Sequence, residues 1–386
     1  MRVDVLGSRA GRPTVAVWAD YWLPLSQTFV MNQIAAMRRW NPVTIGLSSL
    51  PDGLPVTPDL APFATSLSSR AVKRIVGTRG HLRTYTAFLR ERRVSVLHAH
   101  FGPGGINALP LARSAGLPLL VTFHGYDVTR LPRQAGRRGR LYRRQLRYLF
   151  ERADRLVAVS GHVRQQLLEL GAPEGKITVR YVGAPAPHAG AELLPGRTPS
   201  RTGITFVGRL IEKKGVHDLL AAVALLPVPL RDTPISILGS GEEGTRLLRL
   251  AASLGVNATF HGPATPVDVA AALDTAAVFC GPSKSAADGD TEGLPTTLVE
   301  AAHHGATIVS TRHAGIPEFV RDGVEALLVD EGDVAALSAA LALALTDRER
   351  AARLALRAQV RARTHFEIGV CTARLETLYD RLAQAD

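Results

Sequence analysis

Short apolar runs alternate with longer segments of helical periodicity along almost the whole chain. This alternation is typical of parallel α/β folds, in which a helix follows each strand and returns the chain to the same end of the sheet. In the first half we expect six strands, at Thr14–Ala19, Val43–Leu47, Ser95–Ala99, Leu119–Phe123, Leu156–Val159 and Ile177–Tyr181. Helical patterns lie between them near Phe29–Arg39, Gly105–Ala115 and Leu141–Glu151. The first half therefore predicts one doubly wound sheet.

A second series of the same kind follows, with strands expected at Ile204–Val207, Ile235–Leu238, Thr259–His261, Ala277–Cys280, Thr307–Ser310 and Ala326–Val329, and a helix at Asp333–Ala344. Residues 184–201 are rich in Pro, Gly and Ala and have almost no periodicity, as is typical of an interdomain linker. A chain of 386 residues is long enough for two cores. We therefore expect an N-terminal domain over 1–183, a C-terminal domain over 202–365, and a final helix at 366–386 that packs back toward the N-terminal domain.

Three features of the sequence indicate the cellular compartment of the protein. The apolar run around Leu219–Leu230 is broken by Pro227 and Pro229, and it falls short of the roughly 20 residues that span a bilayer. The N-terminal segment lacks the features of a signal peptide, so we expect a cytoplasmic protein. Cys280 and Cys371 are far apart and lack the spacing of metal ligands, so neither a disulfide framework nor a structural zinc site is expected.

The net positive charge of the chain comes from its first half. Residues 1–183 contain 27 Lys and Arg against 10 Asp and Glu, a net charge of +17, whereas residues 184–386 contain 19 against 24, a net charge of −5. The excess lies in two runs, Arg70–Arg93 and Arg130–Arg155. Such runs attract nucleic acid, anionic lipid or a phosphorylated acceptor. An ordinary solvated helix face in an arginine-rich chain is the competing explanation.

The segment with the most specific chemistry contains two acids, Glu292 and Glu300. Pro295 suits the first position of a helix and Gly305 its end, so Glu292 is expected just before the helix and Glu300 in its second turn. The free N–H groups at the helix start, with the flexible Gly293, would bind a diphosphate. A carboxylate accepts from two vicinal hydroxyls at once, which fits a sugar or a ribose. The alternative for Glu292 is an ordinary acid favoured by the helix dipole.

Two cations, Arg209 and Lys214, follow the first strand of the second domain. They lie five residues apart where the chain turns into a helix, and fixed cations there would neutralise a leaving diphosphate. Only five of the 46 basic residues are lysines, which favours a role for Lys214 that needs a compact ammonium; an ordinary surface pair is the alternative. The loop Gly239–Gly244 follows another strand and resembles a phosphate or ribose loop, a pattern of low specificity.

Polar residues also follow two strands of the first domain. His124 at the end of a strand can hydrogen-bond a sugar hydroxyl, and Asp127 can orient it or accept from the acceptor. His98 and His100 end the preceding strand, but buried, hydrogen-bonded histidines explain them equally well, and we assign them no function.

Asp288 and Asp290 have the spacing of a metal-binding Asp-x-Asp pair. Two carboxylates without further ligands are thin support for a metal site, and Arg209 with Lys214 already supplies positive charge. We therefore assign no metal ligands.

Taken together, these segments resemble the GT-B-fold glycosyltransferases of family 4, a retaining class, over nearly the whole chain. The order of the motifs carries the resemblance: Ser-Gln-Thr-Phe at Ser26–Phe29, His-Gly-Tyr-Asp at His124–Asp127, Val-Gly-Arg with Lys-Lys-Gly at Val207–Gly215, and the Glu-x7-Glu pair at Glu292–Glu300. The segments 25–34, 98–102 and 288–295 are similar to the colanic-acid and exopolysaccharide branch of the family. The implied fold is α/β, with two Rossmann-like doubly wound domains that face each other across a cleft.

The resemblance implies a transferase that takes its sugar from a nucleotide sugar and needs no metal or other cofactor. The implied catalytic residues are His124, Arg209, Lys214 and Glu292. The implied donor site comprises Gly208, Arg209, Lys214, Gly239, Gly241, Glu292, Gly293, Leu294, Pro295, Thr296 and Glu300, and the implied acceptor side comprises Ser26, Gln27, His124 and Asp127. Gln27 stands where relatives of this branch usually carry Glu, which leaves the handling of the acceptor open.

For the substrates, the resemblance favours UDP over GDP as the donor nucleotide, and the acceptor would be a glycan, a glycolipid or a small molecule. A polysaccharide intermediate on a lipid diphosphate would explain the basic domain through attraction to the inner face of the plasma membrane, worth about 1 kcal/mol per nearby cation. The alternative acceptor is a soluble natural product such as an antibiotic. A nucleic-acid-binding α/β protein is a distant alternative, because aromatic residues are only 5% of the chain and are not interleaved with the basic runs. An epimerase or phosphorylase of the same fold would need different apparatus.

Overall fold

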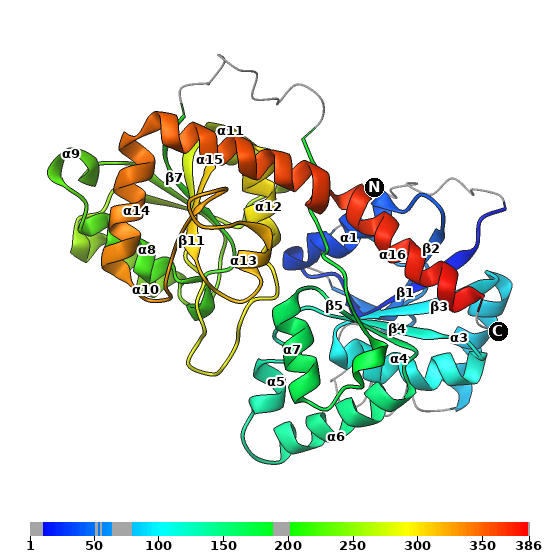
Figure 1. Ribbon diagram of the computed structural model, residues 1–386. Coiled ribbons are helices and arrows are strands. Elements are labelled where there is room, and N and C mark those ends of the chain that lie inside the picture. The colour runs from blue at the N-terminus through cyan, green and yellow to red at the C-terminus, as the bar shows by residue number, and fades with distance from the viewer. Residues whose placement is uncertain (1–10, 51–52, 55, 64–78, 188–200, 385–386) are drawn as a thin grey trace. The chain divides into compact units, whose positions relative to one another are not determined.

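The structure is a computed structural model that describes residues 11–50, 53–54, 56–63, 79–187 and 201–384. The chain divides into two compact units, one formed by Met1–Val182 together with Ile368–Asp386 and the other by Gly183–Glu367. Each unit contains a six-stranded sheet whose paired strands are all parallel, with helices on both faces (Figure 1). The predicted α/β class is confirmed.

The sheet of the first unit has the strand order β2-β1-β3-β4-β5-β6. Its strands are β1 (Thr14–Trp22), β2 (Asn41–Ser49), β3 (Val94–His100), β4 (Leu119–Phe123), β5 (Arg155–Ala158) and β6 (Ile177–Val179). Along β1, Ala16 and Trp18 belong to one buried apolar cluster, whereas Val15 and Val17 belong to another. Since both faces of the sheet are covered, its strands are continuously apolar instead of alternating.

The helices of this unit are α1 (Thr28–Ala36), α3 (Arg79–Glu91), α4 (Gly102–Ala115), α5 (Arg130–Arg133), α6 (Gly136–Arg152), α7 (Gly161–Glu169) and α16 (Ile368–Ala383), with 3-10 turns η1 (Leu25–Gln27) and η2 (Glu174–Lys176). The first part of the first basic run, residues 70–78, lies outside the described residues.

The last helix of the chain belongs to the first unit, where it lies beside α1 (Figure 1). Its residue Glu376 is almost completely buried, and one of its carboxylate oxygens accepts the backbone N–H groups of Arg38, Arg39 and Trp40 at 2.9, 2.7 and 3.1 Å. The apolar residues of α16 join the cluster that contains Val15 and Val17. A segment at the far end of the chain therefore completes the core of the N-terminal unit.

The sheet of the second unit has the order β12-β11-β10-β7-β8-β9. Its strands are β7 (Thr202–Val207), β8 (Ile235–Leu238), β9 (Ala258–Gly262), β10 (Ala276–Gly281), β11 (Thr307–Thr311) and β12 (Leu327–Val329). Its helices are α8 (Val216–Ala224), α9 (Val228–Arg231), α10 (Gly244–Leu254), α11 (Pro266–Thr275), α12 (Thr296–His303), α13 (Ile316–Phe319), α14 (Val334–Thr346) and α15 (Arg348–Arg361), with a 3-10 turn η3 (Glu212–Lys214) and a π-helical turn η4 (Ala362–Phe366).

The boundaries differ in places from those expected. The linker predicted at 184–201 lies largely outside the described residues, although its first part pairs with η4 through a hydrogen bond from the Ala184 N–H to the Phe366 carbonyl. Pro295 is the N-cap of α12 and not its first helical residue, because its ψ of 116° is extended. Within the described part of the chain, no helix is both long and apolar enough to span a membrane.

Candidate functional site

The loop between β10 and α12 is fixed at three consecutive residues. The buried Lys213 ammonium donates to the Thr291 carbonyl at 3.0 Å, and the Glu292 N–H donates to Nε2 of His313 at 3.1 Å. The Gly315 N–H donates to the Gly293 carbonyl at 3.0 Å. The backbone that carries Glu292 is therefore held by the turn η3 on one side and by the loop after β11 on the other.

His313 is itself oriented by an acid. Its Nδ1 is 2.6 Å from Glu331, whose second carboxylate oxygen accepts the Ser285 N–H at 2.7 Å. Because Nε2 of His313 accepts a backbone N–H, its proton is on Nδ1 and points to Glu331. Lys213 and His313 were not predicted as site residues. The available signal was that they lie in the segments that follow β7 and β11.

The side chains of Glu292 and Lys214 meet, with the ammonium 2.8 Å from the carboxylate. Burial by itself would raise the pKa of Glu292, but Lys213 at 3.9 Å and Lys214 outweigh burial and lower this pKa to about 2. Glu292 is therefore ionised at any physiological pH. The two residues form a fixed pair of opposite charges at the carboxyl end of β7.

The pKa of Glu300 is shifted in the opposite direction to that of Glu292. It lies in the second turn of α12, and its burial raises the pKa of the carboxyl to about 7, although Thr296 and Lys214 lower it in part. The two acids predicted to act together thus titrate far apart, one fully ionised at pH 7 and the other half protonated.

Asp290 is an internal counterion. Its carboxylate lies 2.9 Å from the ammonium of Lys213, and the side chains of Lys213 and Asp290 are only 5% and 7% exposed. Asp288 accepts the backbone N–H of Asp290 and shapes the turn. Among the described residues, no three His, Cys, Asp or Glu side chains are grouped as metal ligands. The Asp-x-Asp spacing is thus explained by an ion pair with a residue 77 positions earlier.

Arg209 lies at the same strand end but is exposed, and it forms no ion pair with the described residues. The structure thus brings together Lys214, Glu292 and Glu300, and it leaves the Arg209 guanidinium free on the surface. At the start of α12, after the loop residues Gly293 and Leu294, the N-cap residue Pro295 makes no side-chain cap hydrogen bond to the first N–H groups. Unpaired donors there are available to an anion.

The glycines of the loop after β8 permit close backbone packing. A Cβ on Gly239 would lie 1.9 Å from the Gly208 carbonyl oxygen, and a Cβ on Gly241 would lie 2.3 Å from that of Leu210. The Leu210 N–H also donates to the Ser240 carbonyl at 2.9 Å. Any side chain at these two positions would push this loop away from the segment that carries Arg209.

In the first unit, His124 follows β4 and is half-buried against two aromatic rings. The ring centroids of Phe29 and Phe101 lie 4.9 and 4.4 Å from that of the imidazole. Burial lowers the pKa of His124 well below its usual value, so the ring is neutral. Ser26 and Gln27 lie in η1, directly before the helix that carries Phe29. The expected acceptor-side residues thus come from neighbouring segments of this unit.

Asp127 is fully buried and accepts the backbone N–H groups of Gly102, His124 and Gly125 at 2.9, 3.1 and 2.9 Å. Burial raises its pKa to about 6, and these three donors offset the effect only in part. The geometry therefore favours a role in shaping the His124 loop over the predicted contact with an acceptor hydroxyl.

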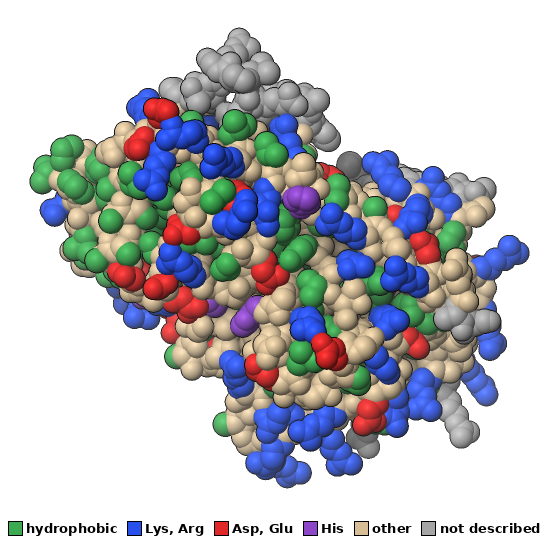
Figure 2. All heavy atoms as spheres, in the orientation of Figure 1, with side chains coloured by type: hydrophobic (Ala, Val, Ile, Leu, Met, Phe, Trp, Pro, Cys, Tyr) green, Lys and Arg blue, Asp and Glu red, His purple; other side chains and the backbone are tan. Residues whose placement is uncertain are grey.

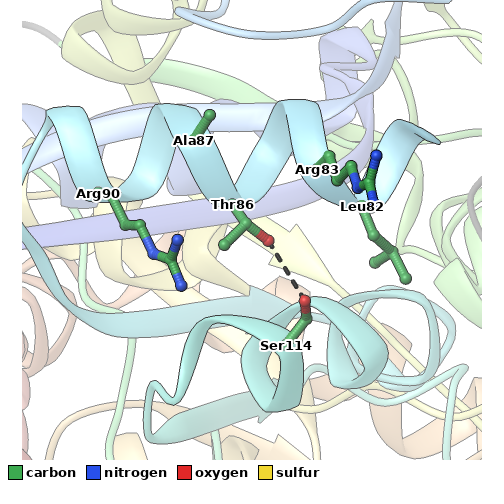
Figure 3. A pocket seen from close by; sticks show the side chains of 6 residues that line it. All are labelled: Leu82, Arg83, Thr86, Ala87, Arg90 and Ser114. Carbon is green, nitrogen blue, oxygen red and sulfur yellow. Dashed lines mark hydrogen bonds between the residues drawn. The ribbon is translucent and has the colours of Figure 1, made fainter. Parts of the chain in front are cut away.

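Outside these loops, the first unit carries two basic surfaces. A hollow between α3 and α4 is lined by Arg83, Thr86, Arg90 and Ser114, with the two hydroxyls 3.4 Å apart at its base (Figure 3). Basic side chains also gather at the end of the unit where α5 and α6 lie (Figure 2). On α6, Leu141 is 58% exposed among arginines one turn before and after it.

The sequence matches two family models, Glycosyltransferase Family 4 over residues 52–185 and Glycosyl transferases group 1 over residues 197–361. The chain is 33% identical over 297 residues to WcaL of Escherichia coli K12, a glycosyltransferase named for colanic acid biosynthesis, covering 75% of this chain and 71% of that protein. It is 30% identical over 291 residues to the amylovoran biosynthesis glycosyltransferase AmsK of Erwinia amylovora, covering 74% and 69%.

Solved structures share the fold. Anabaena HepE, crystallised with UDP and glucose, superimposes with a TM-score of 0.74 at 17% identity, covering 96% of this chain and all of that one. Sucrose-phosphate synthase of Thermosynechococcus elongatus gives 0.75 at 18% identity, covering 97% and 100%. Two doubly wound units, together with these similarities, identify the chain as a glycosyltransferase of the GT-B class. The chain belongs to glycosyltransferase family 4.

Proposed function

We propose that this glycosyltransferase moves a sugar from a UDP-sugar to an acceptor hydroxyl, with retention at the anomeric carbon and without a metal ion. The observation that carries the proposal is the Lys214–Glu292 pair at 2.8 Å beside the uncapped start of α12. The bound UDP of HepE supports the choice of base. GDP is the competing base, because a relative from Mycolicibacterium smegmatis, 30% identical over 284 residues, is named as GDP-mannose-dependent.

Each charged group has a distinct task in this proposal. Lys214, the free guanidinium of Arg209 and the N–H groups of Thr296 and its neighbours neutralise the leaving diphosphate. Ionised Glu292 accepts from hydroxyls of the donor sugar, and Glu300 accepts from the ribose. Asp290 forms its ion pair with Lys213. The positive charge that stabilises the leaving group therefore comes from Lys214 and Arg209 in this proposal, without a metal ion.

Retention follows from attack on the face that the diphosphate leaves. In the family that this chain resembles, the leaving phosphate itself deprotonates the acceptor hydroxyl. The hydroxyl proton then passes to the phosphate oxygen as the sugar–oxygen bond to the acceptor forms, so that no enzymic base is required. Neutral His124 would hold the sugar or the acceptor by a hydrogen bond.

A nucleotide-sugar panel tests the reaction, with release of nucleoside diphosphate as the signal and the anomeric configuration of the product read by NMR. Glu292→Gln and Lys214→Ala should each lower turnover at least roughly 100-fold. Glu349→Gln is the matched control, because this glutamate is 85% exposed on α15. Near-normal rates in both site variants would contradict the proposal, and so would loss of activity on chelation of divalent metals.

We further propose a cell-surface polysaccharide intermediate on an anionic lipid as the acceptor. The names of WcaL and AmsK support this class. Exposed Leu141, with exposed arginines on the adjacent turns of α6, has the composition of a helix that rests on an anionic membrane surface.

Charge reversal tests the membrane surface. Arg140, Arg144 and Arg147 are exposed on α6, whereas Arg143 donates to the Pro132 carbonyl and is left intact. Reversal of the three exposed arginines to Glu should abolish salt-sensitive binding to anionic vesicles. The control reverses Arg348, Arg350 and Arg357 on α15, an equal change in net charge on the second unit. Unchanged vesicle binding in the α6 variant, with transfer to a soluble acceptor, would instead support a natural-product acceptor.

A further inference from the structure

Three histidines of the first unit form a row. The ring centroids of His98 and His100 are 4.5 Å apart, and those of His100 and His124 are 5.3 Å apart. Both nitrogens of His98 have partners, since Nδ1 is 2.6 Å from the Tyr379 hydroxyl and Nε2 is 2.7 Å from the Thr122 hydroxyl. His100, the middle ring, has a described partner on only one of its two nitrogens. Nδ1 of His100 is 3.0 Å from Nε2 of His124, but Nε2 of His100 is buried and bonds to none of the described atoms.

The bond between His100 and His124 can have either of two directions. If His124 donated, neutral His100 would carry its proton on Nε2, and a buried N–H would then lack an acceptor within the described structure. If Nδ1 of His100 donates instead, Nε2 of His100 carries no proton, and this buried atom is an acceptor without a donor among the described atoms. Buried N–H groups without acceptors are rarer than buried acceptors without donors, so the second direction is favoured.

Protonation of both nitrogens does not offer a third arrangement. His100 is 2% exposed, and burial lowers its pKa to about 3. The neighbouring rings of His98 and His124 also have pKa values well below the usual one, because of burial first and their mutual proximity second. All three rings are therefore neutral, and each carries one proton.

We propose that His100 is a positioning residue that fixes the tautomer of His124. Because the Nε2 lone pair of His124 is occupied by the His100 N–H, the proton of His124 lies on Nδ1. That nitrogen has no hydrogen-bond partner among the residues described here, and the ring is half-buried beside Phe29 and Phe101. His124 thus offers a bound ligand an N–H donor and not a base. The proposal rests on the proposed function in so far as the ligand is a sugar or phosphate whose oxygens accept that bond.

Nitrogen NMR of the intact protein tests the tautomer without any substrate. With ¹⁵N-labelled histidine, long-range ¹H–¹⁵N correlations separate protonated from bare ring nitrogens, and His124→Gln identifies the His124 signals among the 12 histidines by their loss. We expect the proton on Nδ1 of His124. In His100→Leu the signals should average between the two tautomers, and in His100→Asn, whose amide N–H can replace Nδ1–H, they should return to the Nδ1–H pattern. His261→Asn, at an exposed position on β9, is the control.

Measurements of activity and thermal unfolding distinguish a positioning role of His100 from a role in folding. In His100→Leu, kcat/KM should fall roughly five- to tenfold, the effect of one lost hydrogen bond, and in His100→Asn it should recover to within about twofold. Thermal unfolding of both variants is measured in parallel. A wild-type His124 protonated on Nε2 overturns the proposal, as does an equal loss of activity in the Leu and Asn variants. If no nucleotide sugar is turned over at all, the proposed function fails, while the spectra still decide the tautomer.

Discussion

The buried ion pair between Lys213 and Asp290 can be tested by Asp290→Asn, which removes one charge and almost no volume. The Lys213 ammonium lies 2.9 Å from Asp290 and 3.9 Å from Glu292. At an effective dielectric constant of about 20, these distances correspond to attractions of about 6 and 4 kcal/mol. Loss of one partner of a buried pair costs about 3–5 kcal/mol. Because Glu292 and the Thr291 carbonyl still face the ammonium, we expect the lower end, about 3 kcal/mol of unfolding free energy.

The chain provides a way to assign that loss to one unit. All three tryptophans, Trp18, Trp22 and Trp40, are buried in the first unit, so tryptophan fluorescence reports only its unfolding, whereas far-UV circular dichroism reports both units. In urea, Asp290→Asn should move the dichroism transition and leave the fluorescence transition in place. Asp288→Asn is the control, since Asp288 is exposed and its replacement keeps an acceptor for the Asp290 N–H. We expect it to cost less than about 1 kcal/mol.

A double-mutant cycle tests whether the unpaired charge of Lys213 causes the loss of stability in Asp290→Asn. If the penalty of Asp290→Asn comes from an uncompensated cation, it should largely disappear when Lys213 is also replaced by Met, giving a coupling energy of about 2 kcal/mol. A loss below about 1 kcal/mol for Asp290→Asn, or additive effects in the cycle, would refute the reasoning. A divalent metal that stabilised the wild type but not Asp290→Asn would restore the metal-site hypothesis.

Three further changes have defined outcomes. Because Glu300 has a pKa of about 7 and is proposed to bind ribose as a carboxylate, UDP affinity should weaken roughly tenfold from pH 8 to pH 6. Glu300→Gln should lose this component in calorimetric titrations, leaving only the nucleotide's own titration. Glu376→Ala removes three charge-assisted hydrogen bonds and should cost about 3–5 kcal/mol by tryptophan fluorescence in urea, and a cost below 1 kcal/mol would contradict the role given to α16. Gly239→Ala should weaken UDP binding more than tenfold, because the added Cβ would displace the Gly208 loop. Gly255→Ala is the control, because there is open space around Gly255. It should leave UDP binding unchanged and cost about 1 kcal/mol of stability.

Much of the fold could be predicted from the sequence because parallel strands covered on both faces are short, apolar and bounded by polar residues. β4 and β8 have the predicted bounds, and the other ten strands overlap their predictions. Short helices such as α9 and α13 were not predicted, because four residues are too few to show a period. The position of Pro295 was wrong by one residue, as helix ends often are.

The candidate site was predictable as a set of strand-end residues but not as a set of contacts. Lys214 and Glu292 were expected to converge, and they do. The partner of Asp290 could not be read from local pattern, because Lys213 lies on a different strand end and its burial depends on packing. Similarly, Asp127 has the residue type of a ligand-binding acid, and only three-dimensional structure shows that its oxygens are occupied by backbone donors.

The placement of α16 makes the second unit an insertion within the first. During synthesis, residues 183–367 leave the ribosome with all of their own strands, whereas the first unit must wait for the last 19 residues, 368–386, before its apolar cluster is closed. The first unit is thus the last to be finished, and a nascent chain cut short within α16 would combine a complete second unit with a first unit whose core is open to water.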